Sequence, residues 1–68
     1  MYRNQEPTPA ERVRAMLSRL RPTEQIDAWG AARDLDLPAL TVERELIAAY
    51  KEGLCEREGN WFGPEVAP

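Results

Sequence analysis

Residues 35–63 constrain the fold more than any other part of the chain, because four local signals follow one another there without a gap. Asp36 stands at a sharp turn, and Asp tolerates left-handed backbone better than most residues do. Apolar periodicity then predicts a helix that begins at residue 38 or 39 and runs to about residue 52. Gly53 supplies the left-handed residue that ends a helix, and residues 59–60 read Gly-Asn, a loop that closes tight hairpins. The expected order is therefore turn, helix, helix stop and hairpin.

The predicted helix over 38–52 has one apolar stripe that should face the core. Its inward residues are spaced at three, four and seven or eight positions, which a 3.6-residue period brings to one side. We expect Leu54, just past the helix stop, to pack back on the core. The inward residues are Val42, Leu46, Ala49 and Tyr50.

A first helix is predicted over about 9–21. Thr8 can accept an orphan backbone N–H, Pro9 suits the first helical position, and Glu11 can reach back to complete a capping box. Pro22 should end this helix, because the residue before a proline is pushed out of the helical region. Its apolar stripe consists of Val13, Met16, Leu17 and Leu20.

A second, shorter helix of about eight or nine residues should start after the N-cap Asp27. Residues 23–26 before it read as either a brief strand or an extended linker. Leu37, after the turn that ends the second helix, should enter the core. The stripe of the second helix consists of Ala28, Ala31, Ala32 and Leu35.

Size and composition indicate one small globular domain. The chain has 68 residues, of which 43% are hydrophobic and 31% charged, as in ordinary folded proteins. We expect residues 8–64 to fold and residues 1–7 and 65–68 to form flexible tails. There is no apolar stretch of membrane-spanning length and no apolar signal-peptide region, so a cytoplasmic location is expected.

The residues needed for several kinds of chemistry are missing from the sequence. There is no histidine, and the single cysteine, Cys55, cannot form an internal disulfide. Zinc ligation and histidine-based catalysis therefore lack their ligands and bases. We expect no catalytic residue, no metal and no cofactor, and we interpret Cys55 as an inert small hydrophobe.

Charge is distributed unevenly along the chain. The net charge is −3, yet residues 1–21 hold five arginines against two glutamates, and the remainder holds four basic against ten acidic residues. The arginines of the first predicted helix flank its apolar stripe, where such side chains commonly lay their stems along the core rim. These are Arg12, Arg14, Arg19 and Arg21.

The run from Val42 through Leu46 to Gly53-Leu54, followed by Arg57-Glu58-Gly59 and Trp61, resembles the winged helix-turn-helix family of small bacterial, archaeal and phage regulators. The resemblance covers roughly residues 9–63. It implies an α+β, mainly α fold, a three-helix winged helix-turn-helix with a short C-terminal β-hairpin wing. Asp36 departs from the usual turn glycine, and Ala31 stands where a larger apolar residue is usual.

The resemblance also implies double-stranded DNA as the partner and transcription regulation as the function. The third helix, about residues 39–52, would enter the major groove, and the wing, residues 54–63, would touch an adjacent groove or the backbone. Arg44 would bond a guanine edge or a phosphate, and Glu43 a cytosine amino group. The expected nucleic-acid contacts are Ala39, Leu40, Thr41, Glu43, Arg44, Ile47, Lys51, Arg57 and Asn60.

An alternative function is a winged-helix module that binds another protein, as an accessory subunit or a phage-encoded effector. The third helix carries an acidic residue and exposes apolar ones where DNA should lie, unless Leu40 and Ile47 are covered by the wing or the N-terminal tail. Trp29 is either an interface anchor or a staple against the first helix or the tail. No membrane is expected as a partner, and a homodimer is expected in the DNA-binding case. The alternative interface consists of Trp29, Leu40, Glu43, Ile47 and Trp61.

Overall fold

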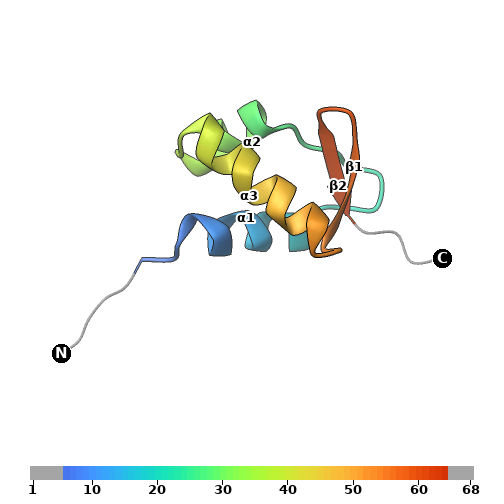
Figure 1. Cartoon of the computed structure of the whole chain (residues 1–68), viewed down its shortest axis with the longest axis horizontal. Helices are drawn as coiled ribbons and strands as arrows, with labels where there is room; N and C mark the ends of the chain where they lie inside the picture. The colour runs from blue at the N-terminus through green and yellow to red at the C-terminus, as the bar shows by residue number, and fades with distance from the viewer. Residues whose placement is uncertain (1–5, 65–68) are drawn as a thin grey trace.

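The computed structural model describes residues 6–64, and it contains three helices followed by a two-stranded antiparallel hairpin. The mainly α, α+β fold class is therefore confirmed. α3 lies between α1 and α2 and contacts both, and the hairpin stands beside the C-terminal half of α3 (Figure 1). No helix within residues 6–64 is long and apolar enough to cross a membrane. The elements are α1 (Pro9–Ser18), α2 (Ala28–Leu35), α3 (Ala39–Lys51), β1 (Cys55–Glu58) and β2 (Trp61–Pro64).

The start of α1 has the predicted capping box. The Thr8 side chain accepts the Glu11 backbone N–H at 3.1 Å, and the Glu11 carboxylate accepts the Thr8 N–H at 2.8 Å. Pro9 occupies the first helical position, where a backbone N–H would have no partner within the helix, so the N–H that proline lacks is not needed. Local chemistry alone therefore determines where this helix begins.

The end of α1 differs from the prediction, since the helix stops at Ser18 and does not reach Arg21. The N–H groups of Arg19 and Leu20 bond to carbonyls three residues back, at 3.1 and 3.2 Å. Such bonds tighten the last turn and lead the chain out of the α-helix. Pro22 therefore lies in the following turn and is not the residue that ends the helix.

α2 begins at the predicted cap. Asp27 accepts the Gly30 backbone N–H at 2.9 Å. A Cβ at position 30 would lie 2.8 Å from the Asp27 carboxylate, so glycine lets this cap approach closely. The cap and the glycine therefore belong to one local arrangement.

α2 and α3 end with the same pair of backbone hydrogen bonds. After α2, Leu37 N–H bonds to Ala32 C=O at 3.0 Å, and left-handed Asp36 (φ 57°) donates to Arg33 C=O at 3.3 Å. After α3, Leu54 N–H bonds to the carbonyl five residues back at 2.9 Å, and left-handed Gly53 (φ 80°) bonds three back at 3.0 Å. This is the Schellman pattern, and both predicted helix stops are confirmed.

The hairpin pairs β1 with β2 in the register Glu58↔Trp61, across the two-residue loop predicted at 59–60. Gly59 has φ 63°, and Asn60 has negative φ, as in a type II′ turn. Ile26 forms an isolated antiparallel bridge to Phe62, with both N–H···O bonds at 2.7 Å. The segment before α2 is thus extended chain with one strand-like residue, which connects the hairpin to the helices.

The core lies where α1, α2, α3 and the hairpin meet. Phe62, Leu46, Val13 and Val42 are its largest fully buried side chains. Burying one such side chain contributes about 1.5–3 kcal/mol. The buried hydrophobic residues are Val13, Leu17, Ala28, Ala31, Ala32, Val42, Leu46, Ala49, Cys55 and Phe62, and Leu37 packs against them as predicted.

Two residues predicted to face the core do not. Tyr50 and Leu54 are each 44% exposed. Tyr50 follows the fully buried Ala49, and one residue turns a helix by about 100°, which takes Tyr50 off the inward stripe. Leu54 precedes the buried Cys55, and successive side chains of extended backbone point to opposite sides.

Candidate functional site

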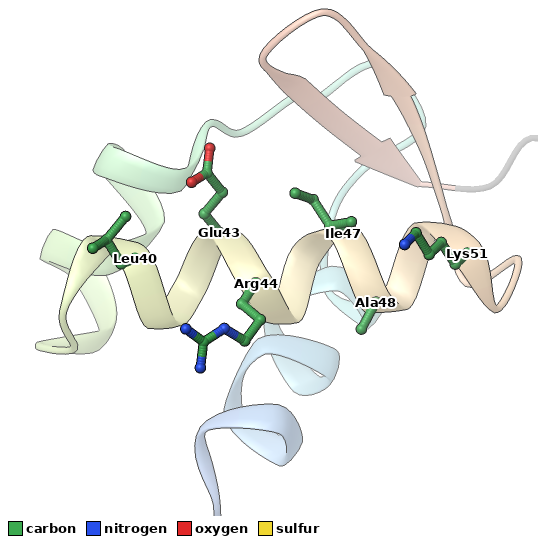
Figure 2. Close-up of a pocket in the computed structure, with 6 residues that line it drawn as sticks. All are labelled: Leu40, Glu43, Arg44, Ile47, Ala48 and Lys51. Atoms are coloured by element: carbon green, nitrogen blue, oxygen red, sulfur yellow. The ribbon is translucent and has the colours of Figure 1, made fainter.

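The outward side of α3 presents a continuous surface of six residues, here called the α3 flank: Leu40, Glu43, Arg44, Ile47, Ala48 and Lys51. Their spacing of three and four residues brings them to one side of the helix. All six come from one helix, so the surface is an open stripe and not an enclosed cavity (Figure 2). A surface of this shape suits a large partner better than a small molecule.

The α3 flank changes character along its length. Leu40, in the first turn, is 75% exposed, whereas Ile47 is half-buried and packs against the core. Arg44 and Lys51 are exposed, and neither belongs to an ion pair within residues 6–64. The flank is therefore apolar at its N-terminal end and carries free cations in its middle and at its C-terminal end.

Not all predicted contact residues of α3 lie on the flank. Ala39 is half-buried and packs against the core, and Thr41 is half-buried. Pro38, the N-cap of α3, makes no side-chain cap hydrogen bond. The first N–H groups of α3 therefore have no side-chain cap partner.

The hairpin lies next to the middle of the α3 flank. A hollow between them is lined by Glu43 and Trp29 from the helices and by Arg57 and Asn60 from the hairpin, with Phe62 also in its lining. The Arg57 Nε donates to the Gly59 carbonyl at 3.0 Å, and its guanidinium lies 5.5 Å from the centre of the Phe62 ring. These two contacts fix the position of the Arg57 side chain on the hairpin, where it remains exposed.

Trp29 is 75% exposed and lies beside Leu40. The two side chains border a second hollow whose other lining residues are Ala28, Ala39 and Glu43. This exposure means that α1 does not cover Trp29, and the N-terminal residues 1–5 lie outside the described part of the chain. Trp29 and Leu40 together make an apolar patch at the N-terminal end of the flank.

Trp61 and Phe62 have different environments. Phe62 is 2% exposed and belongs to the core, whereas Trp61 is 49% exposed. Neighbouring residues of a strand point to opposite faces, so Trp61 lies on the other face of the hairpin from Phe62 and the hollow that Phe62 lines. The structure therefore does not bring Trp61 together with Trp29.

Two arginines of α1 hold the ends of the other helices. An Arg12 Nη donates to the carbonyl of Leu35, the last residue of α2. An Arg14 Nη lies 2.9 and 2.8 Å from the two carboxylate oxygens of Glu52, directly after α3. The basic character of α1 is thus used in part for contacts inside the domain, which the sequence did not indicate.

Cys55 lies in the core and outside both hollows. Its Sγ is 3.9 Å from the Leu46 carbonyl, and burial, followed by the negative charge of Glu56, raises the pKa of the thiol. A raised pKa lowers the thiolate fraction and hence the reactivity. Residues 6–64 also contain no group of three His, Cys, Asp or Glu side chains placed to hold a metal.

Comparisons with protein-family models, with curated proteins and with solved structures gave no significant match. The arrangement of three helices and a C-terminal hairpin is compatible with a winged-helix layout.

Proposed function

We propose that this chain is a winged helix-turn-helix protein that binds double-stranded DNA as a transcription regulator, with α3 in the major groove. The observation that supports this most is the α3 flank, an exposed helix side on which Arg44 and Lys51 form no ion pair with any residue from 6 to 64. An α-helix fits the major groove of B-form DNA, and the hairpin beside it can reach the adjoining backbone.

Each exposed residue of the flank then has a role set by its chemistry. Arg44, near the middle, bonds a guanine edge or a phosphate, and Lys51 neutralises a phosphate. Leu40 contacts the methyl group of a thymine. Glu43 accepts from a cytosine amino group, which is a hydrogen-bond donor in the major groove.

The hairpin supplies the remaining contacts. Arg57 and Asn60 lie on the side of the hairpin that faces Glu43, so they continue the surface of the α3 flank. Arg57 adds a third cation, and the amide of Asn60 can bond phosphate oxygens. Few phosphates are contacted in this arrangement, so binding by one copy should be weak.

A salt titration of binding to a duplex of random sequence tests the proposal. On a duplex of random sequence Arg44, like Lys51, contacts phosphate. Each neutralised phosphate contributes about 0.9 to the slope of log affinity against log salt, so Arg44→Ala and Lys51→Ala should each lower the slope by about that amount. Arg21→Ala removes the same charge from an exposed position off the flank and serves as the matched control. No binding at low salt, or an equal effect of all three substitutions, would contradict the proposal.

A protein-binding function is the second candidate, favoured by the patch of Trp29 and Leu40. Both side chains are 75% exposed, and they border the same hollow. Exposed tryptophans at the centre of an apolar patch are frequent anchors of protein interfaces. Capture of a specific protein that is lost in both Trp29→Ala and Leu40→Ala, but kept in Lys51→Ala, would support this candidate.

A further inference from the structure

A second surface lies between α1 and the segment that leads into α2, away from the α3 flank. Its floor is formed by Met16 and Leu20 of the α1 side and by Ile26 and Leu35 opposite, all half-buried and packed on the core. α1 and α2 each pack against α3 and touch each other little, so their facing sides leave this α1–α2 groove open. The groove shares no residue with the α3 flank or with either hollow beside it.

The two walls of the α1–α2 groove carry opposite charges. Arg19 lies along the α1 wall, and Arg12 reaches from that wall to the Leu35 carbonyl, whereas Glu24 and Asp34 lie on the side opposite α1. The hydrogen bonds of Arg12 and Glu24 within the domain go to backbone groups, the Leu35 carbonyl and the Arg21 N–H. The one ion pair within residues 6–64 is Arg14 with Glu52, so no arginine of the groove forms an ion pair with a carboxylate of the groove.

We propose that the α1–α2 groove is the docking surface for a second copy of this chain. In a two-fold symmetric contact each copy offers the same surface, so the surface must complement itself. A two-fold axis along the groove sets the basic wall of one copy against the acidic wall of the other. An axis across the groove would set like charges together, so the charges select one orientation.

This orientation pairs the two ends of the groove separately. Arg19 lies at the same end as Glu24, and Arg12 lies at the same end as Leu35, beside Asp34. With the two-fold axis along the groove, each end of the groove in one copy faces the same end in the other copy. This places Arg19 near Glu24 of the second copy. The apolar floors meet between the charged walls, and the pairing of charges determines the register.

The dimer is inferred independently of DNA binding, and it leaves the α3 flank of both copies free. Self-association is measured without DNA, so its failure would not be mistaken for failure of the DNA proposal.

Sedimentation equilibrium over a range from micromolar to near-millimolar concentrations tests the dimer. Ala15 is exposed and lines the groove, so Ala15→Glu should raise the dissociation constant at least about tenfold by adding bulk and charge. Ser18→Glu places the same group on the same helix outside the groove lining and should leave the constant unchanged. Circular dichroism checks that both variants fold.

Charge reversal tests directly whether charged residues of the two copies pair across the groove. Arg19→Glu should weaken the dimer, and adding Glu24→Arg to the same chain should restore much of the lost association, because Arg19 of one copy lies near Glu24 of the other. A protein that stays monomeric at every concentration would overturn the proposal. Equal effects of Ala15→Glu and Ser18→Glu, or a double variant weaker than Arg19→Glu alone, would overturn it as well.

Discussion

Asp36 and Gly53 close successive helices with equivalent hydrogen bonds, although their side chains differ. Both have positive φ, which glycine adopts freely and Asp adopts at lower cost than most residues. Asp36 also keeps a carboxylate at the turn between α2 and α3, where glycine would carry no charge. The turn is therefore made by a residue that adds to the acidity of this part of the chain.

Asp27 and Gly30 should behave as one unit. Asp27→Ala should lower the free energy of unfolding by about 1 kcal/mol, because the cap of α2 is lost. Gly30→Ala brings its Cβ against the Asp27 carboxylate and breaks the same cap, but alanine recovers up to about 1 kcal/mol of helix propensity. Asp27→Ala should then cost little in the Gly30→Ala background. Urea unfolding of the four proteins measures this coupling, and strictly additive losses would contradict it.

We expect the contribution of Cys55 to the stability of the protein to be lost at alkaline pH. Burial raises the pKa of its thiol above the ordinary value of 9.0, so the unfolded chain loses the proton first as pH rises. The contribution of Cys55 is complete below about pH 9 and is lost as pH increases through the folded pKa. The difference in free energy of unfolding between wild type and Cys55→Ala should therefore shrink from pH 8 towards pH 10. A constant difference would contradict the burial effect.

α1 is connected to the C-terminal ends of both other helices through two arginines with different surroundings. Arg12 supplies a donor to the last carbonyl of α2, a group that has no partner within its own helix. Arg14 offsets the charge of Glu52, which is unfavourable at the negative end of the α3 dipole. These contacts hold the three helices together at their ends, outside the apolar core.

The two arginines should differ in their effect on stability. Arg12→Ala should cost about 1.5–3 kcal/mol, because a part-buried charged donor is removed from an orphan carbonyl. Arg14→Ala should cost at most about 1 kcal/mol, since the Arg14 and Glu52 side chains are 45% and 51% exposed. Thermal unfolding at low and high salt measures both, and only the Arg14 effect should shrink with salt. An Arg14 loss equal to that of Arg12 would contradict this.

The starts of α1 and α2 and the ends of α2 and α3 are predictable from sequence because their chemistry is local, whereas the end of α1 at Ser18 is not. Thr8 with Glu11, Asp27 with Gly30, and the left-handed residue after α3 each act within a few positions of the sequence. The bridge between Ile26 and Phe62 joins residues far apart, so the sequence left the segment before α2 open between strand and linker. Leu54 was placed wrongly for the same reason, since its side of the chain depends on how the hairpin docks.

The candidate site was predictable in part. Helical periodicity placed Leu40, Arg44 and Lys51 on the outside of α3, as the structure does. It also placed Ala39 there, but packing against the core turns Ala39 partly inward. Trp29 and Leu40 come together because of the angle between α2 and α3. The spacing of residues within one helix does not predict that angle.

The domain as a whole presents two surfaces with different properties. The α3 flank offers free cations beside an apolar patch, and the α1–α2 groove offers opposite charges around an apolar floor. The overall charge of −3 does not oppose DNA binding by itself, because the field at the contact surface decides the approach of a polyanion. The two surfaces share no residue, so each can be tested without disturbing the other.

Nuclear magnetic resonance of the labelled protein, titrated with a short DNA duplex at low salt, tests the proposed DNA-binding surface most directly. We predict amide shift changes that concentrate in residues 40–51 and in residues 57–60 at the tip of the hairpin, and that diminish as salt is added. Residues 12–24 on the α1 side should show smaller changes. An absence of shift changes at low salt, or changes centred on α1, would contradict DNA binding through the α3 flank.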